Sequence, residues 1–254
     1  MHLFERFNQY SKSDGRSNQL KSKVEQFACS LFLLLICAGS QANILEESGM
    51  EAYQPGEEVS SEWRFRVFLD RKEIGFHDYR ITGSGEQRRV DTIAEFDVKI
   101  LFLNAYRYRH KNIELWNSGC LSSIDSVTDA NGDDFIVKGA IDDNNFVVSD
   151  GSDTKRLPNC IKSFAYWNPE FLNASNLLNA QTGELEPVDI TFEKQEVVQF
   201  NGAEINAHRY LVKAKSAEIT LWYASDDSRW LALQSLDRDG RTIRYEPLVL
   251  PASS

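Results

Sequence analysis

The sequence has few of the residues that build metal centres and disulfide frameworks. Its 254 residues include four cysteines, four histidines and two methionines. No His-x-His or Cys-x-x-Cys pair occurs, so the usual spacing of zinc ligands is missing. The Gly-x-Ser-x-Gly signature of α/β-hydrolases and the glycine-rich loops that bind phosphates are missing too. We therefore predict that the protein binds no metal and no cofactor.

Basic residues are also fewer than acidic ones. The chain has 28 Lys and Arg against 38 Asp and Glu, which gives a formal net charge of −10 at pH 7. An acidic surface repels the phosphate backbone of nucleic acids. Residues 106–111 alternate aromatic with basic side chains, but in a strand these two kinds point to opposite faces. The sequence therefore predicts no nucleic-acid partner.

The one long apolar run is too short to span a bilayer comfortably. It covers residues 27–37 and follows two lysines, as the core of a signal peptide does. Ser40 and Ala42 supply the small residues that signal peptidase requires, so we predict cleavage between Ala42 and Asn43. A buried core helix or a membrane anchor is the alternative interpretation. Cleavage would leave a periplasmic protein with no transmembrane segment in the mature chain.

Cysteine pairing follows from the predicted export. Cleavage removes Cys29 and Cys37 and leaves Cys120 and Cys160. Two cysteines in an oxidising compartment usually pair. We therefore predict a disulfide between Cys120 and Cys160.

Most of the remaining chain alternates between apolar and polar residues with a period of two, which is typical of half-buried strands. The pattern predicts strands over 63–69, 90–102, 105–116, 120–128, 134–140, 145–149, 188–200, 204–213, 217–224, 229–237 and 241–247. Short turn sequences such as Asn131-Gly and Asn201-Gly separate these runs and favour hairpins. We predict an all-β fold with minor α content: an antiparallel meander of about ten to twelve strands, curved into an open barrel or half-barrel.

The sequence predicts four regions along the chain. Residues 1–42 form a signal peptide with an N-terminal extension, and 43–62 form a flexible leader. Residues 63–247 form a single β domain, and 248–254 form a C-terminal tail. A mature chain of this length suits one domain.

One segment breaks the alternation and predicts a helix. Asn168 suits the N-cap and Pro169 suits the first helical position, so we expect one helix near 169–178. The only non-β element would lie in or across the concave side of the sheet. Tyr166, Trp167 and Phe171 are then the candidate ligand-binding residues, either as a plug that completes the core or as a lid over a ligand.

The histidines are the candidates for chemistry. His77, His110 and His208 each lie in an alternating segment and have a carboxylate within four residues. Histidines that converge with carboxylates could act as general acids and bases. Half-exposed histidines on a sheet are the alternative, because no spacing within one strand places two of them on the same face.

Four strings in the sequence resemble a known family. They are Trp63-Arg-Phe-Arg-Val-Phe-Leu-Asp-Arg-Lys-Glu-Ile-Gly-Phe-His77, Glu114-Leu-Trp-Asn-Ser-Gly-Cys-Leu121, Cys160-Ile-Lys-Ser-Phe-Ala-Tyr-Trp-Asn-Pro169 and Leu177-Leu-Asn-Ala-Gln-Thr-Gly-Glu184. The resemblance is to exported proteobacterial proteins classed as a domain of unknown function, number 6134. It covers about residues 63–247 and departs from the opening pattern at Arg71, where a glycine is usual. The opening pattern is also similar to periplasmic half-barrel domains that are distantly like lipoprotein carriers. The resemblance implies the fold and the compartment, but no reaction.

Three functions remain open. The first is a non-catalytic periplasmic binding or envelope-support protein with an apolar concave groove, whose partner is an apolar small molecule, a lipid or an envelope protein. The second is a small hydrolase or isomerase, which would bring two or more histidines and carboxylates with shifted pKa values into one pocket. A carrier would show an apolar groove without such convergence. The third is a protein-interaction module, which would expose an apolar patch or a free sheet edge.

Overall fold

A computed structural model describes residues 59–100, 103–215, 217–236 and 240–253. The predicted signal peptide and the Ala42–Asn43 cleavage site lie outside these residues. Within the described ranges, no helix is both long enough and apolar enough to cross a membrane.

The fold is one antiparallel sheet, as the alternation of the sequence predicts, and it has fourteen strands where about ten to twelve were expected. The strands are β1 (Val59–Leu69), β2 (Lys72–Ser84), β3 (Gln87–Ile100), β4 (Leu103–Asn117), β5 (Cys120–Ala130), β6 (Asp133–Asp142), β7 (Asn145–Ser149), β8 (Thr154–Pro158), β9 (Asn176–Leu178), β10 (Leu185–Phe200), β11 (Ala203–Ala214), β12 (Glu218–Ala224), β13 (Trp230–Leu236) and β14 (Thr242–Val249). The predicted ranges do not include β2, β8 or β9. β1 and β14 extend slightly beyond the predicted limits of the domain.

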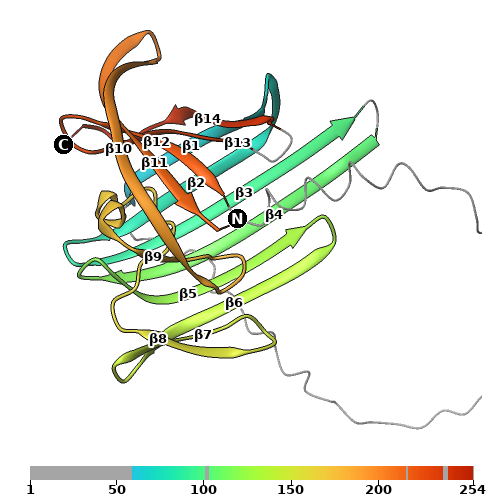
Figure 1. The fold of residues 1–254 in the computed structure, drawn as a ribbon, viewed down its shortest axis with the longest axis vertical. Helices are drawn as coiled ribbons and strands as arrows, with labels where there is room; N and C mark the ends of the chain where they lie inside the picture. Colours follow the sequence, from blue (N-terminus) through green and yellow to red (C-terminus); the bar gives the residue numbers. More distant parts are fainter. Residues whose placement is uncertain (1–58, 101–102, 216, 237–239, 254) are drawn as a thin grey trace, which may run out of the picture.

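The chain forms two meanders that join at the middle of the sheet. The order is β8-β7-β6-β5-β4-β3-β2-β1-β14-β13-β12-β11-β10-β9, so the first and last strands pair with each other. The sheet curves strongly, and β10 to β13 lie in front of the long central strands in Figure 1. Among the described strands, β8 and β9 do not pair. The sheet is therefore an open half-barrel, which confirms the predicted fold class.

The chain returns from one edge of the sheet to the other through residues 159–175. In passing, it joins two strands that do not pair directly. The Leu121 N–H donates to the Ile161 carbonyl at 2.9 Å, and the Leu178 N–H donates to the Lys162 carbonyl at 2.8 Å. The start of β5 is free for this contact because β6 pairs with β5 only from Ser123 onward. Residues 161–163 therefore bridge β5 and β9 at one end of the half-barrel.

The predicted helix near 169–178 is wrong beyond its first turn. A 3-10 helix covers only Pro169–Asn173, although Asn168 caps it as predicted by accepting a hydrogen bond from the Glu170 N–H. The backbone is extended again at Ala174. Leu177 and Leu178 belong to β9, where pairing with β10 satisfies their backbone groups and buries both side chains. Sheet pairing outweighs the weak helical pattern of this segment.

The predicted Asn-Gly hairpins are confirmed. Asn131 and Asn201 have φ of 61° and 49°, and each glycine that follows also has positive φ. Each pair forms a two-residue loop between strands whose flanking residues are in register. These turns match the twist of the strands that they connect.

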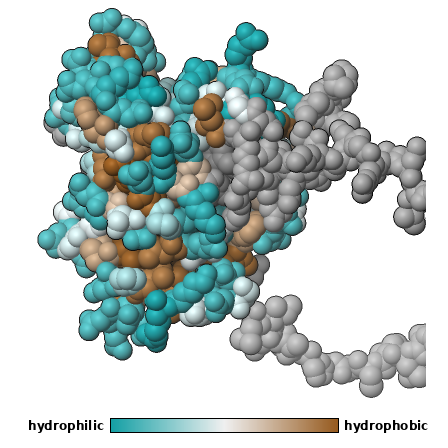
Figure 2. All heavy atoms as spheres, viewed as in Figure 1, coloured by the Kyte–Doolittle hydropathy of each residue, from teal (hydrophilic) through white to brown (hydrophobic). Residues whose placement is uncertain are grey.

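One large hydrophobic core fills the concave side. It joins the inner face of the central strands to the return segment through Tyr166, Trp167 and Phe171. Figure 2 shows hydrophobic side chains gathered in the middle of this face, with hydrophilic side chains around them. The hydrophobic core therefore lies between the inner face of the sheet and the return segment.

Candidate functional site

Four neighbouring strands place a row of residues side by side on the concave face. His77 in β2 pairs with Ala94 in β3, Ala94 pairs with His110 in β4, and His110 pairs with Thr128 in β5. Directly opposite residues of antiparallel strands share a face. Because Ala94 is the smallest of the four, it leaves space between the two histidines.

The next row is polar as well. Thr92, Asn112 and Ser126 are paired in the same way across β3, β4 and β5, and Glu114 follows on β4. All four are buried, with Asn112 only 6% and Glu114 only 4% exposed. Buried polar groups are stable only when they find partners, so a polar patch inside a hydrophobic core requires an explanation.

A cavity of about 120 Å³ lies over these two rows. The return segment and residues 179–181 cover it, while Ile219, Leu233 and Tyr245 close the side formed by β12 to β14. The aromatic residues that line it include Tyr79, Phe96, Tyr108, Tyr166, Trp167 and Tyr245. The cavity is therefore aromatic over much of its wall and polar at its floor.

Burial favours the uncharged form of both histidines at the floor. His77 Nδ1 lies 3.1 Å from the Tyr245 hydroxyl, and His110 Nδ1 lies 2.8 Å from the Thr128 hydroxyl. Burial lowers the pKa of His110 to about 3. Burial, and then the neighbouring His110, lower the pKa of His77 well below its usual value. A buried imidazole without an acidic partner favours its neutral form.

Glu114 is held by three hydrogen-bond donors. Asn112 Nδ2 donates to Oε1 at 3.0 Å and Trp116 Nε1 donates to Oε2 at 2.9 Å. A hydrogen bond to Ser163 is the third. Burial raises the pKa of Glu114 above its usual value, and the three hydrogen bonds offset this shift only in part. Donors of this kind stabilise the carboxylate.

Two buried polar atoms at the floor lack a hydrogen-bond partner. They are His77 Nε2 and Asn112 Oδ1. The Asn112 amide is oriented by its bond to Glu114, so Oδ1 is left as an acceptor. Leaving such a group unpaired costs about 1–3 kcal/mol. A molecule in the cavity that bonds to these atoms would recover that energy.

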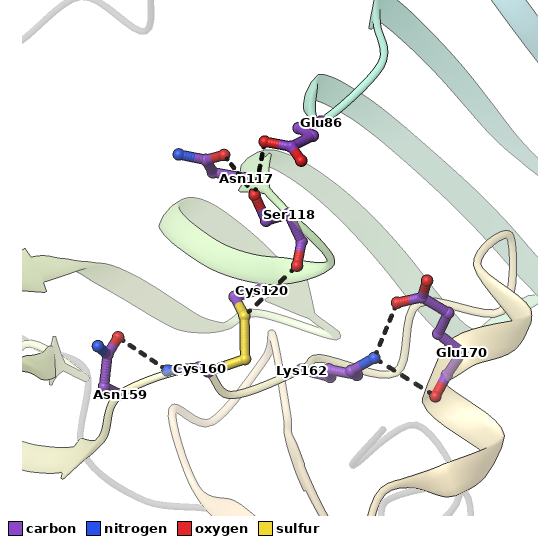
Figure 3. Close-up of a disulfide and its surroundings, with 8 residues drawn as sticks. All are labelled: Glu86, Asn117, Ser118, Cys120, Asn159, Cys160, Lys162 and Glu170. Carbon is purple, nitrogen blue, oxygen red and sulfur yellow. Dashed lines mark hydrogen bonds and ion pairs between the residues drawn. A yellow bond between two sulfur atoms is a disulfide. The ribbon is translucent and has the colours of Figure 1, made fainter.

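The cover of the cavity is anchored at several points. Cys120 and Cys160 form the predicted disulfide (Figure 3), with Cα atoms 4.6 Å apart. The hydrogen bond from Leu121 to Ile161 lies next to it in the sequence. Lys162 bridges to Glu170 of the 3-10 helix at 3.1 Å (Figure 3). Deeper in the half-barrel, the Tyr223 hydroxyl donates to the Tyr166 carbonyl and the Trp167 ring packs edge-on against Trp116 at 5.4 Å. These contacts fix the return segment against both halves of the sheet.

Comparison with known proteins identifies the family. The sequence matches the family described as Domain of unknown function (DUF6134) over residues 65–248. The chain belongs to this family. No curated protein matches the sequence.

Among solved structures, this DUF6134 chain is similar to a β-barrel-like protein of the DUF1849 family from Brucella abortus. The TM-score is 0.57 at 12% identity, covering 77% of this chain and 98% of that one. A DUF1329 family protein from Desulfovibrio piger aligns with a TM-score of 0.22 at 11% identity, covering 74% of this chain and 82% of that one. The Brucella structure supports the β-barrel-like fold and, at this identity, nothing beyond the fold.

The structure brings together some of the residues that the sequence suggested and separates others. His77 and His110 line the cavity, as do Tyr166 and Trp167. His208 does not line it, since it lies on β11 with its Nε2 2.7 Å from Gln195 Nε2. Phe171 is fully buried in the core and is not one of the described residues that line the cavity. No group of three or more His, Cys, Asp or Glu within the described ranges could hold a metal ion.

Sequence reasoning missed Asn112 and considered Glu114 only as a carboxylate within four residues of His110. A signal was present, because β4 inverts the expected pattern at this point. Asn112 and Glu114 point inward, while Ile113 is partly exposed and Leu115 is 43% exposed. Read alone, this alternation suggests that the apolar residues face the core. Only the register with β3 and β5 shows that the polar residues do.

The sheet also leaves a long edge open. β9 pairs only with Leu185, Glu186 and Pro187 of β10, so the rest of β10 has one partner strand among those described. Phe192 and Val197 on this strand are 51% and 53% exposed. This edge meets the criterion stated above for an interaction module, and it lies outside the cavity.

Proposed function

We propose that this protein binds a small ligand in the cavity of its half-barrel and does not catalyse a reaction there. The observation that carries the proposal is the pairing of an aromatic wall with two buried polar atoms, His77 Nε2 and Asn112 Oδ1, that lack partners. Binding sites are typically apolar clefts with a few convergent polar groups that orient the ligand. The cavity has this composition.

The volume limits the ligand. An engineered cavity of about 150 Å³ binds benzene, whereas sites for drug-sized ligands measure about 300–1,000 Å³. At about 120 Å³, this cavity accepts a compact molecule with few heavy atoms. A lipid chain would require the return segment to move. The wholly apolar groove expected from the sequence is therefore replaced by a smaller site with a polar floor.

Catalysis is the second candidate, and a specific observation favours it. His77, His110 and Glu114 converge in one cavity and all have shifted pKa values, which is the criterion set above for an enzyme. The lowered pKa values of the two histidines argue against it. A general base works best with a pKa near the working pH, whereas that of His110 is about 3. Burial raises the pKa of Glu114, which would suit a base, but both of its carboxylate oxygens already accept hydrogen bonds from the protein.

We also propose that the protein works in the periplasm. The disulfide between Cys120 and Cys160 fits a protein that folds in an oxidising compartment. The apolar run at residues 27–37 supports export by a cleaved signal peptide. A periplasmic site would give the cavity access to small molecules that cross the outer membrane.

Native mass spectrometry of the protein purified from its own bacterium, without denaturation, tests the binding proposal. We expect a bound small molecule on the wild type. Ala94→Leu should abolish it, because the larger side chain fills the space between His77 and His110. Ala130→Leu is the matched control, since Ala130 is equally buried on β5 but does not line the cavity.

Two results would contradict the proposal: no adduct on the wild type, or an adduct that survives Ala94→Leu unchanged. Overpacking costs about 1–3 kcal/mol in both variants, so their stabilities are compared first. A compound that leaves as a chemically altered product during incubation with the purified protein would favour the catalytic alternative.

A further inference from the structure

We infer that the ligand of the cavity is a small organic cation, such as a compact amine or quaternary ammonium compound. This inference rests on the proposed binding function and adds the charge of the ligand. It follows from three features of the cavity: a buried carboxylate, a lack of basic groups and an aromatic wall.

The carboxylate is Glu114. Three hydrogen bonds, from Asn112, Trp116 and Ser163, hold it in a position that is only 4% exposed. These donors stabilise the ionised form, although burial raises the pKa of the group. A buried negative charge is nevertheless costly unless a positive charge lies near it.

No basic side chain supplies that positive charge. Among the described residues that line the cavity, none is Lys or Arg. The two histidines are poor substitutes, because burial lowers the pKa of both. A cationic ligand would therefore provide the missing counter-charge, whereas an anionic ligand would be repelled by Glu114.

The free hydrogen-bonding atoms point to the same class of ligand. Asn112 Oδ1 has no partner and can only accept, because the Nδ2 group of the same amide is already bound to Glu114. A protonated amine donates to such an oxygen through its N–H, whereas choline has no N–H and would donate through its hydroxyl group. Trp167 Nε1 is a buried donor without a partner, which suits a hydroxyl or similar oxygen elsewhere on the ligand.

The aromatic wall favours a cation as well. Tyr79, Phe96, Tyr108, Tyr166, Trp167 and Tyr245 all contribute to it. Aromatic rings attract cations through their quadrupole by about 2 kcal/mol or more when water is excluded. Enclosure by several rings is the usual way in which proteins recognise quaternary ammonium groups. A ring-sized cavity of about 120 Å³ restricts the choice to compact cations.

The test compares choline with its neutral isostere 3,3-dimethylbutan-1-ol by titration calorimetry on the purified full chain. The two probes share shape and hydroxyl group and differ in charge. We expect choline to bind at least about tenfold more tightly, as a charge interaction of roughly 1.4 kcal/mol requires.

Variants assign the effect to the carboxylate. Glu114→Gln should remove the advantage of choline and leave the neutral isostere nearly unaffected. Glu186→Gln is the matched control, because Glu186 is also buried and bound by an asparagine, Asn179, but does not line the cavity. The wild-type comparison stands even if Glu114→Gln fails to fold.

The outcomes separate the two proposals. Equal or tighter binding of the neutral isostere would overturn the cationic ligand and leave the binding function intact. No binding of either probe at millimolar concentration would overturn both for ligands of this size. Choline binding that survives Glu114→Gln unchanged would also overturn the cationic inference.

Discussion

The disulfide between Cys120 and Cys160 should contribute a large part of the stability of the fold. It joins the start of β5 to the return segment and encloses a loop of 40 residues. That loop contains β5 to β8, the last four strands toward one edge of the sheet. Beyond it, the return segment carries Tyr166 and Trp167 into the core.

The chain-entropy model sets the magnitude. For a separation of 40 residues, cross-linking removes about 13 cal/mol/K of entropy from the unfolded chain, or roughly 4 kcal/mol at 25 °C. For a domain of this size, each kcal/mol shifts the melting temperature by about 2–4 °C. We therefore expect Cys120→Ser with Cys160→Ser to lower the melting temperature by roughly 8–16 °C.

Thermal unfolding of the double variant and of the wild type, each with and without reductant, provides the assay. Reductant should bring the wild type down to the level of the variant and leave the variant unchanged. A fall of less than about 1 kcal/mol would refute the entropic reasoning. A fall that reductant reproduces in the variant would assign the effect to another cause.

Three further predictions concern single positions. Trp167→Ala should lower the free energy of unfolding by about 3–5 kcal/mol, because the ring is only 5% exposed and packs against Trp116. His110 should make the protein less stable in acid. Its pKa is about 3 in the folded protein and about 6.5 in the unfolded chain, so between these pH values only the unfolded chain binds the extra proton. The free energy of unfolding should therefore fall by roughly 3 kcal/mol between pH 7 and pH 4. Gly75→Ala should lower stability by more than about 3 kcal/mol, because φ is 152° and a Cβ would overlap the Glu95 carbonyl.

Each of these has a control and a contradicting result. A melting temperature within about 2 °C of the wild type for Trp167→Ala would identify a movable lid in place of a packed plug. NMR titration of His110 with a midpoint above pH 5 would contradict its burial, and His110→Gln should flatten the acid dependence. Gly132→Ala controls for the glycine variant, since its turn has open space around the added Cβ. Equal losses for both glycines would contradict the steric argument.

Period-two alternation predicted most of the sheet because one face of almost every strand is buried. The strand predicted over 90–102 is β3 (Gln87–Ile100), and the turns at Asn131 and Asn201 lie where the sequence places them. No range was predicted for the thirteen-residue β2, although His77 was placed in an alternating segment. The other two strands that alternation missed have five residues in β8 and three in β9. Segments so short contain too few alternations to show a period.

The site was harder to predict than the fold. Which histidines converge depends on register across β2, β3 and β4, and register is not visible within a single strand. His77 and His110 meet because both are opposite Ala94, whereas His208 lies on β11. In this part of β4 the usual pattern is inverted, because the charged Glu114 is buried while the apolar Leu115 is exposed. Buried polar groups at a binding site break the hydrophobic pattern that identifies a core.

Intermolecular NOEs test the central claim most directly, because they locate a bound molecule without reference to its charge. The protein is saturated with choline or 3,3-dimethylbutan-1-ol, whichever binds more tightly, and NOEs from the methyl groups of the probe are recorded. The account predicts NOEs to the ring protons of Tyr79, Phe96 and Tyr108, which line the cavity. NOEs confined to exposed residues outside it, such as Leu115 or Phe192, would contradict the account.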